Sequence, residues 1–244
     1  MNKLPFFDCN CSIGRICHPY ILDLSDIGAL KEEMQTAGIE EALVYHTTAR
    51  DAHPPMGNTL LLEKIKNHIE LYPVWVVLPH HTGEMPRPEK LVDEMISKGV
   101  KAVRMYPSPA IHSFSLDEWC SGNLLAALED SRIPLVLELE TQTWSSVQIV
   151  LKEHSQLPLI ISGCNYRQNR FLYPLLECHK NLFIETSTFM GAGGIEHIVN
   201  RFGSRPLLFG TNMPRYTGTA AISRLAYANI TLKDKEAIAG NNLR

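Results

Sequence analysis

Two glutamates on one predicted strand are the residues of this sequence best suited to chemistry. Glu138 and Glu140 alternate with leucines in the segment 135–140, LVLELE. The two-residue period of a strand places both carboxylates on the face opposite the leucines. Neighbouring carboxyl groups can act as general acid and general base when their surroundings differ. We therefore predict that Glu138 and Glu140 are catalytic.

The preceding strand-like segment carries a cation in the same pattern. In residues 101–106, KAVRMY, Arg104 and Tyr106 share one face. An arginine can hold a substrate carboxylate or stabilise a developing oxyanion. The alternative is that Arg104 pairs with Glu138 or Glu140 and only balances their charge.

Short apolar runs alternate with helical patterns along the whole chain. Eight runs have the length and composition of buried strands: residues 6–8, 42–45, 74–78, 102–105, 135–139, 159–162, 182–186 and 207–209. Strands that alternate with helices predict a parallel sheet covered on its faces, and eight such units predict an α/β fold of the (β/α)8 TIM-barrel type. We expect one domain over residues 1–244. An open doubly wound sheet is the alternative, although no Gly-x-Gly-x-x-Gly turn follows the first run.

In such a barrel, functional side chains lie at the carboxyl ends of the strands and in the loops that follow. In the first run, the strand period turns Asp8, Asn10 and Ser12 inward and Phe7, Cys9 and Cys11 toward the helices. The residues that we predict to bind substrate are Asn10, Ser12, His46, Arg104, Tyr106, Asn165, Tyr166, Arg167, Arg170 and Asn212.

Charge, apolar segments and cysteine spacing limit the kinds of molecule that the protein is expected to bind and the compartment in which it is expected to work. The net charge is −3, and no basic run exceeds a dipeptide, which argues against nucleic acid. No apolar segment reaches the ~18 residues of a membrane span. The six cysteines are scattered without a C-x-x-C pair, as is typical of a reduced, cytoplasmic protein. We expect a small-molecule substrate or ligand as the partner, neither nucleic acid nor a membrane, and a chain that can form a homo-oligomer.

Several segments resemble the amidohydrolase-related family of metal-dependent barrel hydrolases, whose members include decarboxylases and lactonases of small acids. Residues 8–14, DCNCSIG, are similar to its first strand, Asp-x-His-x-His-x-Gly, and residues 99–107, GVKAVRMYP, to its fourth strand. Residues 207–214, LLFGTNMP, resemble its closing Leu-Leu-Phe-Gly-Ser-Asp-x-Pro, and residues 238–242, IAGNN, its last helix. The resemblance implies hydrolysis of a C–N, lactone or ester bond, or decarboxylation, of a small polar, carboxylated substrate.

The metal ligands of that family are not kept. Its first-strand histidines fall on Asn10 and Ser12, its eighth-strand aspartate falls on Asn212, and its sixth-strand histidine falls near Gly163 or Cys164. Asn, Ser and Gly supply neither the imidazole nor the carboxylate ligands that zinc prefers. We therefore predict no metal ligands and no cofactor, although the family norm is a divalent metal such as zinc.

Several of these residues have a second interpretation. His46, His80 and His81 could form a replacement metal site with a glutamate, or they could cap loops. Arg167 and Arg170 either bind an anion or brace their own loop.

Cysteine, asparagine and aspartate residues at the predicted strand ends also have roles that the sequence suggests. Cys164 is either an activated nucleophile or an inert buried thiol. We expect Asn10 and Asn212 to hydrogen-bond to each other, and Asp8 to hold its strand.

The sequence thus supports two functions. In the first, the protein is an amidohydrolase-like hydrolase in which Glu138 or Glu140 activates water while an arginine holds the substrate anion. In the second, it is a catalytically inactive barrel that binds a ligand or serves as a partner subunit, because function depends on the site and not on the fold.

Overall fold

A computed structural model describes residues 4–15, 22, 24–189, 191 and 193–244. Eight parallel strands form one sheet in sequence order, and each strand pairs with the next. They are β1 (Phe6–Ile13), β2 (Ile39–His46), β3 (Leu71–Val76), β4 (Ala102–Met105), β5 (Leu135–Glu138), β6 (Leu159–Ser162), β7 (Leu182–Glu185) and β8 (Leu207–Leu208). All eight predicted strands are therefore present.

The sheet closes on itself between its last and first strands. The amide of Cys9 donates to the carbonyl of Phe209 at 2.9 Å, and the amide of Ser12 donates to that of Met213 at 3.0 Å. Cys11 and Met213 also form a parallel bridge. These bonds make the sheet a barrel, as predicted, and the alternative of an open doubly wound sheet is wrong.

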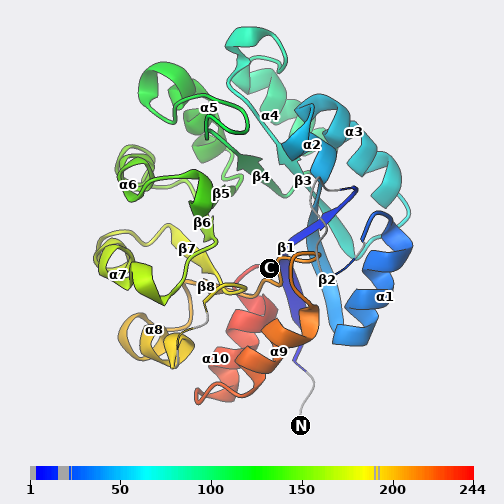
Figure 1. Cartoon of the computed structure of the whole chain (residues 1–244). Helices are drawn as coiled ribbons and strands as arrows, with labels where there is room; N and C mark the ends of the chain where they lie inside the picture. Colours follow the sequence, from blue (N-terminus) through cyan, green and yellow to red (C-terminus); the bar gives the residue numbers. More distant parts are fainter. Residues whose placement is uncertain (1–3, 16–21, 23, 190, 192) are drawn as a thin grey trace.

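Helices surround the strands on the outside (Figure 1). They are α1 (Ile27–Ala37), α2 (Thr47–Asp51), α3 (Pro54–Ile65), α4 (Pro88–Ser97), α5 (Glu118–Asp130), α6 (Trp144–Glu153), α7 (Asn169–Cys178), α8 (Gly194–Phe202), α9 (Gly218–Ala226) and α10 (Leu232–Glu236). Short 3-10 turns η1 (His80–Thr82), η2 (Leu139–Thr141) and η3 (Tyr166–Gln168) follow three of the strands, and the π-helical turn η4 (Ala237–Asn241) follows α10. The sequence did not predict α2, which begins directly after β2.

The side chains of the strands divide between two cores. The larger core lies between the barrel and the helices. The smaller core fills the inside of the barrel with Phe7, Cys9, Leu43, Val74, Ala102, Val136, Ile160 and Leu208. Strand alternation explains this division, because successive residues point to opposite faces. It also turns the leucines of β5 toward the helices, as expected.

Strand β1 departs from regular alternation. Asp8 pairs with Ala42 and Cys11 pairs with Val44, so β1 holds one residue more than β2 over this stretch. Such a bulge changes which face the following side chains occupy. Phe7 and Cys9 follow regular alternation and both point into the barrel, where we expected them to face the helices, because the expected orientation of this strand was reversed before the bulge. The bulge then leaves Cys11 in the outer core and lets Asn10 reach the barrel interior.

Asp8 joins the two strands at the seam of the barrel. One of its carboxylate oxygens accepts from the amides of Asn10 at 2.9 Å and Thr211 at 3.0 Å. The other accepts from the Thr211 hydroxyl at 2.5 Å and from the Cys11 thiol at 2.9 Å. Burial raises the pKa of this carboxyl, while the four donors oppose the shift. Asp8 thus holds β1 against the segment that follows β8.

We expect Asp8→Asn to lower the free energy of unfolding by about 1–3 kcal/mol. The NH2 group of the asparagine would replace one accepting oxygen, and it cannot accept the hydrogen bonds that this oxygen receives. Urea denaturation measures this change. Asp130→Asn, which removes an exposed carboxylate at the end of α5, is the matched control and should have little effect. Equal stability of the two variants would show that Asp8 does not hold the seam.

Candidate functional site

The carboxyl ends of the strands enclose a buried polar network centred on Arg104 of β4. Its guanidinium donates to the Asn10 side-chain oxygen at 2.6 Å and to the Tyr106 hydroxyl at 2.8 Å. It also lies over the Tyr45 ring, 4.5 Å from the ring centroid. Only 3% of the Arg104 surface is exposed. The positive charge therefore lies inside the barrel, as the sequence pattern predicted.

Glu185, the last residue of β7, completes this network on its far side. Its carboxylate accepts from the Asn10 amide at 3.0 Å, from the Ser187 hydroxyl at 2.7 Å and from the Ser187 backbone amide. Burial raises the pKa of Glu185 to about 6. It packs against Gly210, where a Cβ would overlap the carboxylate. Asn10 thus bridges a buried cation and a buried carboxyl group.

A second ion pair lies nearer the surface. Arg50, at the end of α2, contacts Asp51 at 2.8 Å and Glu138 at 3.8 Å. Its guanidinium lies 5.3 Å from the centroid of the Tyr106 ring. The Glu138 side chain is 15% exposed, so it can reach both the barrel interior and solvent. Glu138 is therefore the carboxylate placed where a ligand could meet it.

The two predicted catalytic glutamates occupy different environments. Glu138 faces the barrel mouth as expected, whereas Glu140 points outward and pairs with Arg215 at 3.1 Å. The cause is η2, which ends the strand alternation at Leu139. The alternative salt bridge between a glutamate and Arg104 is not formed, since Glu138 pairs with Arg50, but Glu138 still attracts the Arg104 charge over a longer distance.

Glu140 instead lines a groove of about 550 Å³ beside the mouth. The groove lies between the loops that follow β4 and β5, and its lining residues include Pro107, Phe114, Trp119, Glu140, Gln142 and Ser146. This places Glu140 at the rim of the barrel and away from Arg104.

The remaining predicted residues near β1 and β2 have structural partners. The Asn10 amide group is used by Glu185 and Arg104, so the expected Asn10–Asn212 hydrogen bond is absent. Asn212 adopts a left-handed backbone conformation in the turn after β8, with φ of 56°. The Ser12 hydroxyl donates to Met213 at 3.4 Å. His46 caps α2 by accepting from Thr48 at 3.2 Å, and burial lowers its pKa.

The loop after β6 also holds itself together. Asn165 begins η3 with a capping box, accepting from the Arg167 amide at 3.0 Å. Arg167 and Arg170 are exposed, and Arg167 contacts the ring hydroxyl of exposed Tyr166 at 3.2 Å. Cys164 is buried, which raises the pKa of its thiol to about 12. A thiol held in its neutral form is a poor nucleophile.

The side chains at the mouth do not fit the metal that the resembled family uses. The Asn10 amide is already engaged on both sides, and the Cys164 thiol is not ionised at neutral pH. The replacement site of His46, His80 and His81 is not assembled, since His46 caps a helix and His81 contacts the carbonyl of Cys120 at 3.1 Å. Within the described residues, the only group of three His, Cys, Asp or Glu side chains close enough together to hold a metal ion lies away from the mouth, on the flank of the barrel.

Sequence reasoning missed Arg50, Tyr45 and Glu185 as members of the site. Glu185 could have been found, because period-two alternation places it on the same face as Phe183, which contacts the inner core. Arg50 gave no such signal, since it belongs to the short helix α2, for which the sequence carries no clear periodicity.

The structure resembles several solved barrels, while no protein-family model and no curated protein matches the sequence. An uncharacterised TIM-barrel protein from Bordetella bronchiseptica superposes with a TM-score of 0.76 at 16% identity, covering 98% of this chain and 96% of the other. The 5-carboxyvanillate decarboxylase of Novosphingobium aromaticivorans, complexed with manganese and a nitrobenzoic acid, gives 0.74 at 11% identity, with 98% and 94% covered.

A third similar structure is a probable 2-pyrone-4,6-dicarboxylic acid hydrolase from Acinetobacter baumannii with citric acid bound. Its TM-score is 0.69 at 12% identity, with 98% of this chain and 97% of the other covered. One of these neighbours is uncharacterised, and the other two are named a decarboxylase and a probable hydrolase. At these identities the similarity confirms the predicted TIM-barrel fold.

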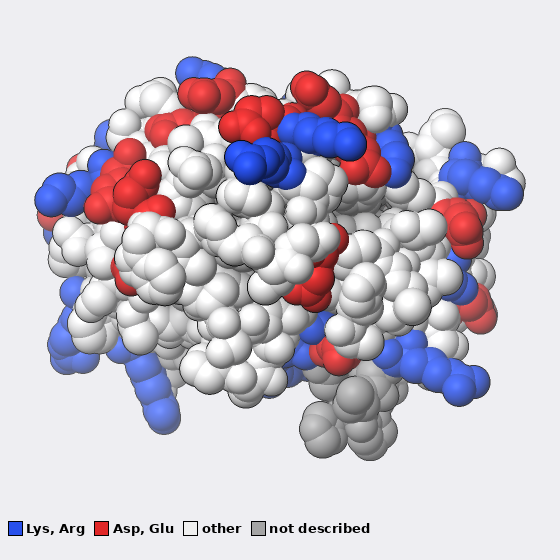
Figure 2. All heavy atoms as spheres, turned by 90° about the horizontal axis from the view of Figure 1, so that it is seen from above, with Lys and Arg blue, Asp and Glu red and all other residues white. Residues whose placement is uncertain are grey.

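The outer surface carries charges of both signs. Figure 2 shows acidic and basic side chains side by side along the upper edge of one face, above a broad band of uncharged residues. No helix in the described ranges is long and apolar enough to cross a membrane.

The buried carboxyl of Glu185 makes stability depend on pH. Its pKa rises from 4.5 in a reference state to about 6 in the folded protein, so the folded state holds the proton more tightly. Its contribution is complete below pH 4.5 and is lost as the pH rises through 6, with a magnitude of about 2 kcal/mol.

We therefore expect the wild-type free energy of unfolding, compared with that of Glu185→Gln, to decline between pH 4.5 and 6. Denaturant unfolding at a series of pH values measures the difference. Parallel pH profiles of the two proteins would show that Glu185 does not titrate in this range.

Proposed function

We propose that this protein binds a small carboxylate-bearing compound at the barrel mouth and hydrolyses or decarboxylates it without the metal set of the amidohydrolase-related family. The observation that carries the proposal is the bonding of Arg104. Within the described part of the chain, this buried cation is held by neutral groups, the Asn10 amide, the Tyr106 hydroxyl and the Tyr45 ring. No carboxylate is hydrogen-bonded to this guanidinium among the described residues, and the nearby Glu138 acts on it through electrostatic attraction alone. A buried guanidinium whose hydrogen-bond partners are neutral favours an anionic ligand.

The roles follow from the positions of the side chains. Arg50 is 27% exposed and lies 5.3 Å from the ring centroid of Tyr106, the neighbour of Arg104, so it would meet the carboxylate of a ligand that enters from solvent. Glu138, next to Arg50, is the group that would act as general base toward water or the substrate. Support comes also from the similar solved barrels, which include a 5-carboxyvanillate decarboxylase and a 2,6-dihydroxybenzoate decarboxylase.

A second candidate function is ligand binding without turnover. It is favoured by the saturation of the deeper carboxylates, since the protein's own donors occupy both oxygens of Asp8 and both of Glu185. Glu140, the other predicted catalytic residue, points away from Arg104. In this second function, the protein would bind a carboxylate compound without converting it and would act as a sensor or as a partner subunit.

Binding can be tested with 2,6-dihydroxybenzoate and 2-pyrone-4,6-dicarboxylate as probes, using calorimetry and thermal unfolding. We expect Arg50→Gln to weaken binding about 10–100-fold, because a charge-assisted hydrogen bond contributes about 1.5–3 kcal/mol. Arg104→Lys, which keeps the charge but not the forked geometry, should also weaken it.

Arg201→Gln is the matched control, since Arg201 pairs with Glu177 on the outer surface. Equal affinity in wild type, Arg50→Gln and Arg104→Lys would place binding elsewhere. If wild type binds neither probe nor a wider panel of small carboxylic acids, the carboxylate proposal itself is wrong.

Turnover separates the two candidate functions. We expect Glu138→Gln to keep affinity for the probe but to lower kcat about 10²–10⁴-fold, the usual contribution of a general base. Loss of probe absorbance with time measures the rate. A wild-type protein that binds a carboxylate tightly but converts none of the panel would support binding without catalysis.

A further inference from the structure

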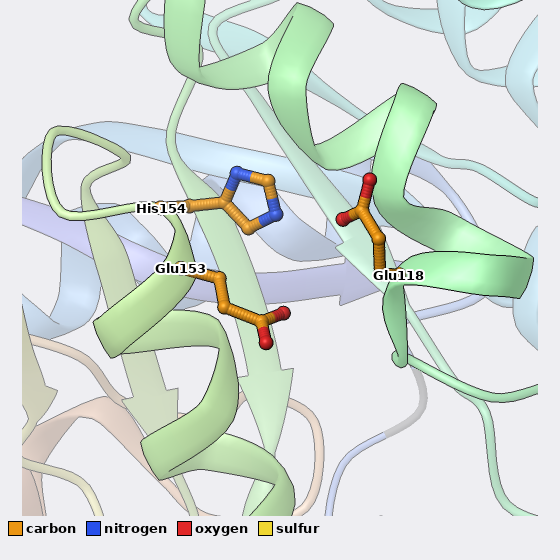
Figure 3. Close-up of side chains that lie close together, drawn as sticks. All are labelled: Glu118, Glu153 and His154. Carbon is orange, nitrogen blue, oxygen red and sulfur yellow. The ribbon is translucent and has the colours of Figure 1, made fainter.

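A cluster of metal-ligating side chains lies on the flank of the barrel, between α5 and α6. Glu118 comes from the first turn of α5, Glu153 is the last residue of α6, and His154 follows it. One ligand atom from each residue lies within 4.8 Å of those of the other two. Figure 3 shows the imidazole and both carboxylates turned toward a common space. The two glutamates are exposed, so the cluster alone does not define a site.

The histidine supplies an independent observation. His154 is 5% exposed, and its Nε2 is buried without a hydrogen-bond partner. In Figure 3 this nitrogen points at the two glutamates. A buried polar atom without a partner is costly, and a bound cation would satisfy it. The imidazole is therefore oriented toward a ligand that the protein itself does not provide.

The other ring nitrogen is fixed in the way that metal-binding histidines require. Nδ1 of His154 lies 3.0 Å from a carboxylate oxygen of Glu129. The second oxygen of Glu129 accepts from the Gln156 amide at 2.7 Å, which holds the carboxylate in place. A carboxylate on one ring nitrogen sets the tautomer and makes the other nitrogen a better metal ligand.

The helix α5 is shaped to place the Glu118 carboxylate. Gly122, one turn farther along, is buried, and a Cβ at this position would overlap the Glu118 carboxylate. Glycine weakens a helix interior relative to alanine, so its presence here needs a local reason. The space that it leaves allows Glu118 to lie along the helix, on the side that faces Glu153.

We propose that Glu118, Glu153 and His154 bind a divalent transition-metal ion of the zinc type. One imidazole and two carboxylates suit zinc, which lies about 2.0–2.2 Å from such ligands. Three protein ligands leave a coordination position for water. The ion would join α5 to α6 and lies outside the barrel mouth, so this site is independent of the proposed carboxylate site.

The test uses the full-length protein after chelation, titrated with ZnCl₂ by calorimetry and with Co²⁺ by visible absorption. We expect wild type to bind one ion and to unfold at a higher temperature in its presence. Glu153→Gln and Gly122→Ala should each weaken Zn²⁺ binding by at least about tenfold, and Glu129→Gln by about 10–100-fold. Gly122→Ala leaves all three ligands in the sequence, so its effect reports on the position of Glu118.

Asp130→Asn removes an exposed charge from the same helix and should bind Zn²⁺ like wild type. His154→Ala should abolish binding, and because His154 is buried, the exposed Glu153 variant keeps the test valid if the His154 variant does not fold. Failure of wild type to bind Zn²⁺ or Co²⁺ would overturn the proposal. Unchanged affinity in Glu153→Gln and Gly122→Ala would also overturn it, and would place the ion elsewhere in the chain.

Discussion

The seam between β1 and β8 is the constraint on which the barrel depends. A parallel barrel closes only when its last strand hydrogen-bonds to its first, and here β8 spans only Leu207–Leu208. The Asp8 carboxylate compensates for this short strand, because it accepts hydrogen bonds from both Asn10 and Thr211. The same seam carries Asn10 into the barrel interior. Closure of the barrel and placement of the polar network therefore have one origin.

The polar network places a fixed positive charge inside the barrel, beside Asn10. Arg104 donates to Asn10, on which the sequence resemblance predicts that a family metal ligand falls, and Asn10 in turn donates to Glu185. A guanidinium differs from a metal in that it cannot lower the pKa of bound water to the same degree. It can still orient an anion through paired hydrogen bonds. The proposed chemistry is limited in this way to what Glu138 and the arginines can do.

The sequence predicted the fold well because strand and helix periods are strong local signals. It also predicted that Arg104, Tyr106 and Glu138 face the barrel mouth. It failed where a local irregularity interrupts the period. The turn η2 directs Glu140 outward, and the bulge in β1 places Cys11 in the outer core although Cys9 points inward. Partners brought together by tertiary structure, such as Arg50 with Glu138 or His154 with Glu129, leave no trace in spacing along the chain.

The bulge in β1 also affects how this chain is compared with others. Because β1 has one residue more than its neighbour between Asp8 and Cys11, residues after the bulge are displaced by one position from those of a regular strand. An alignment without a gap would pair Asn10 and Ser12 with residues of the opposite face in such a strand. A sequence whose first strand lacks this bulge therefore needs a one-residue gap at this point when it is aligned with this chain.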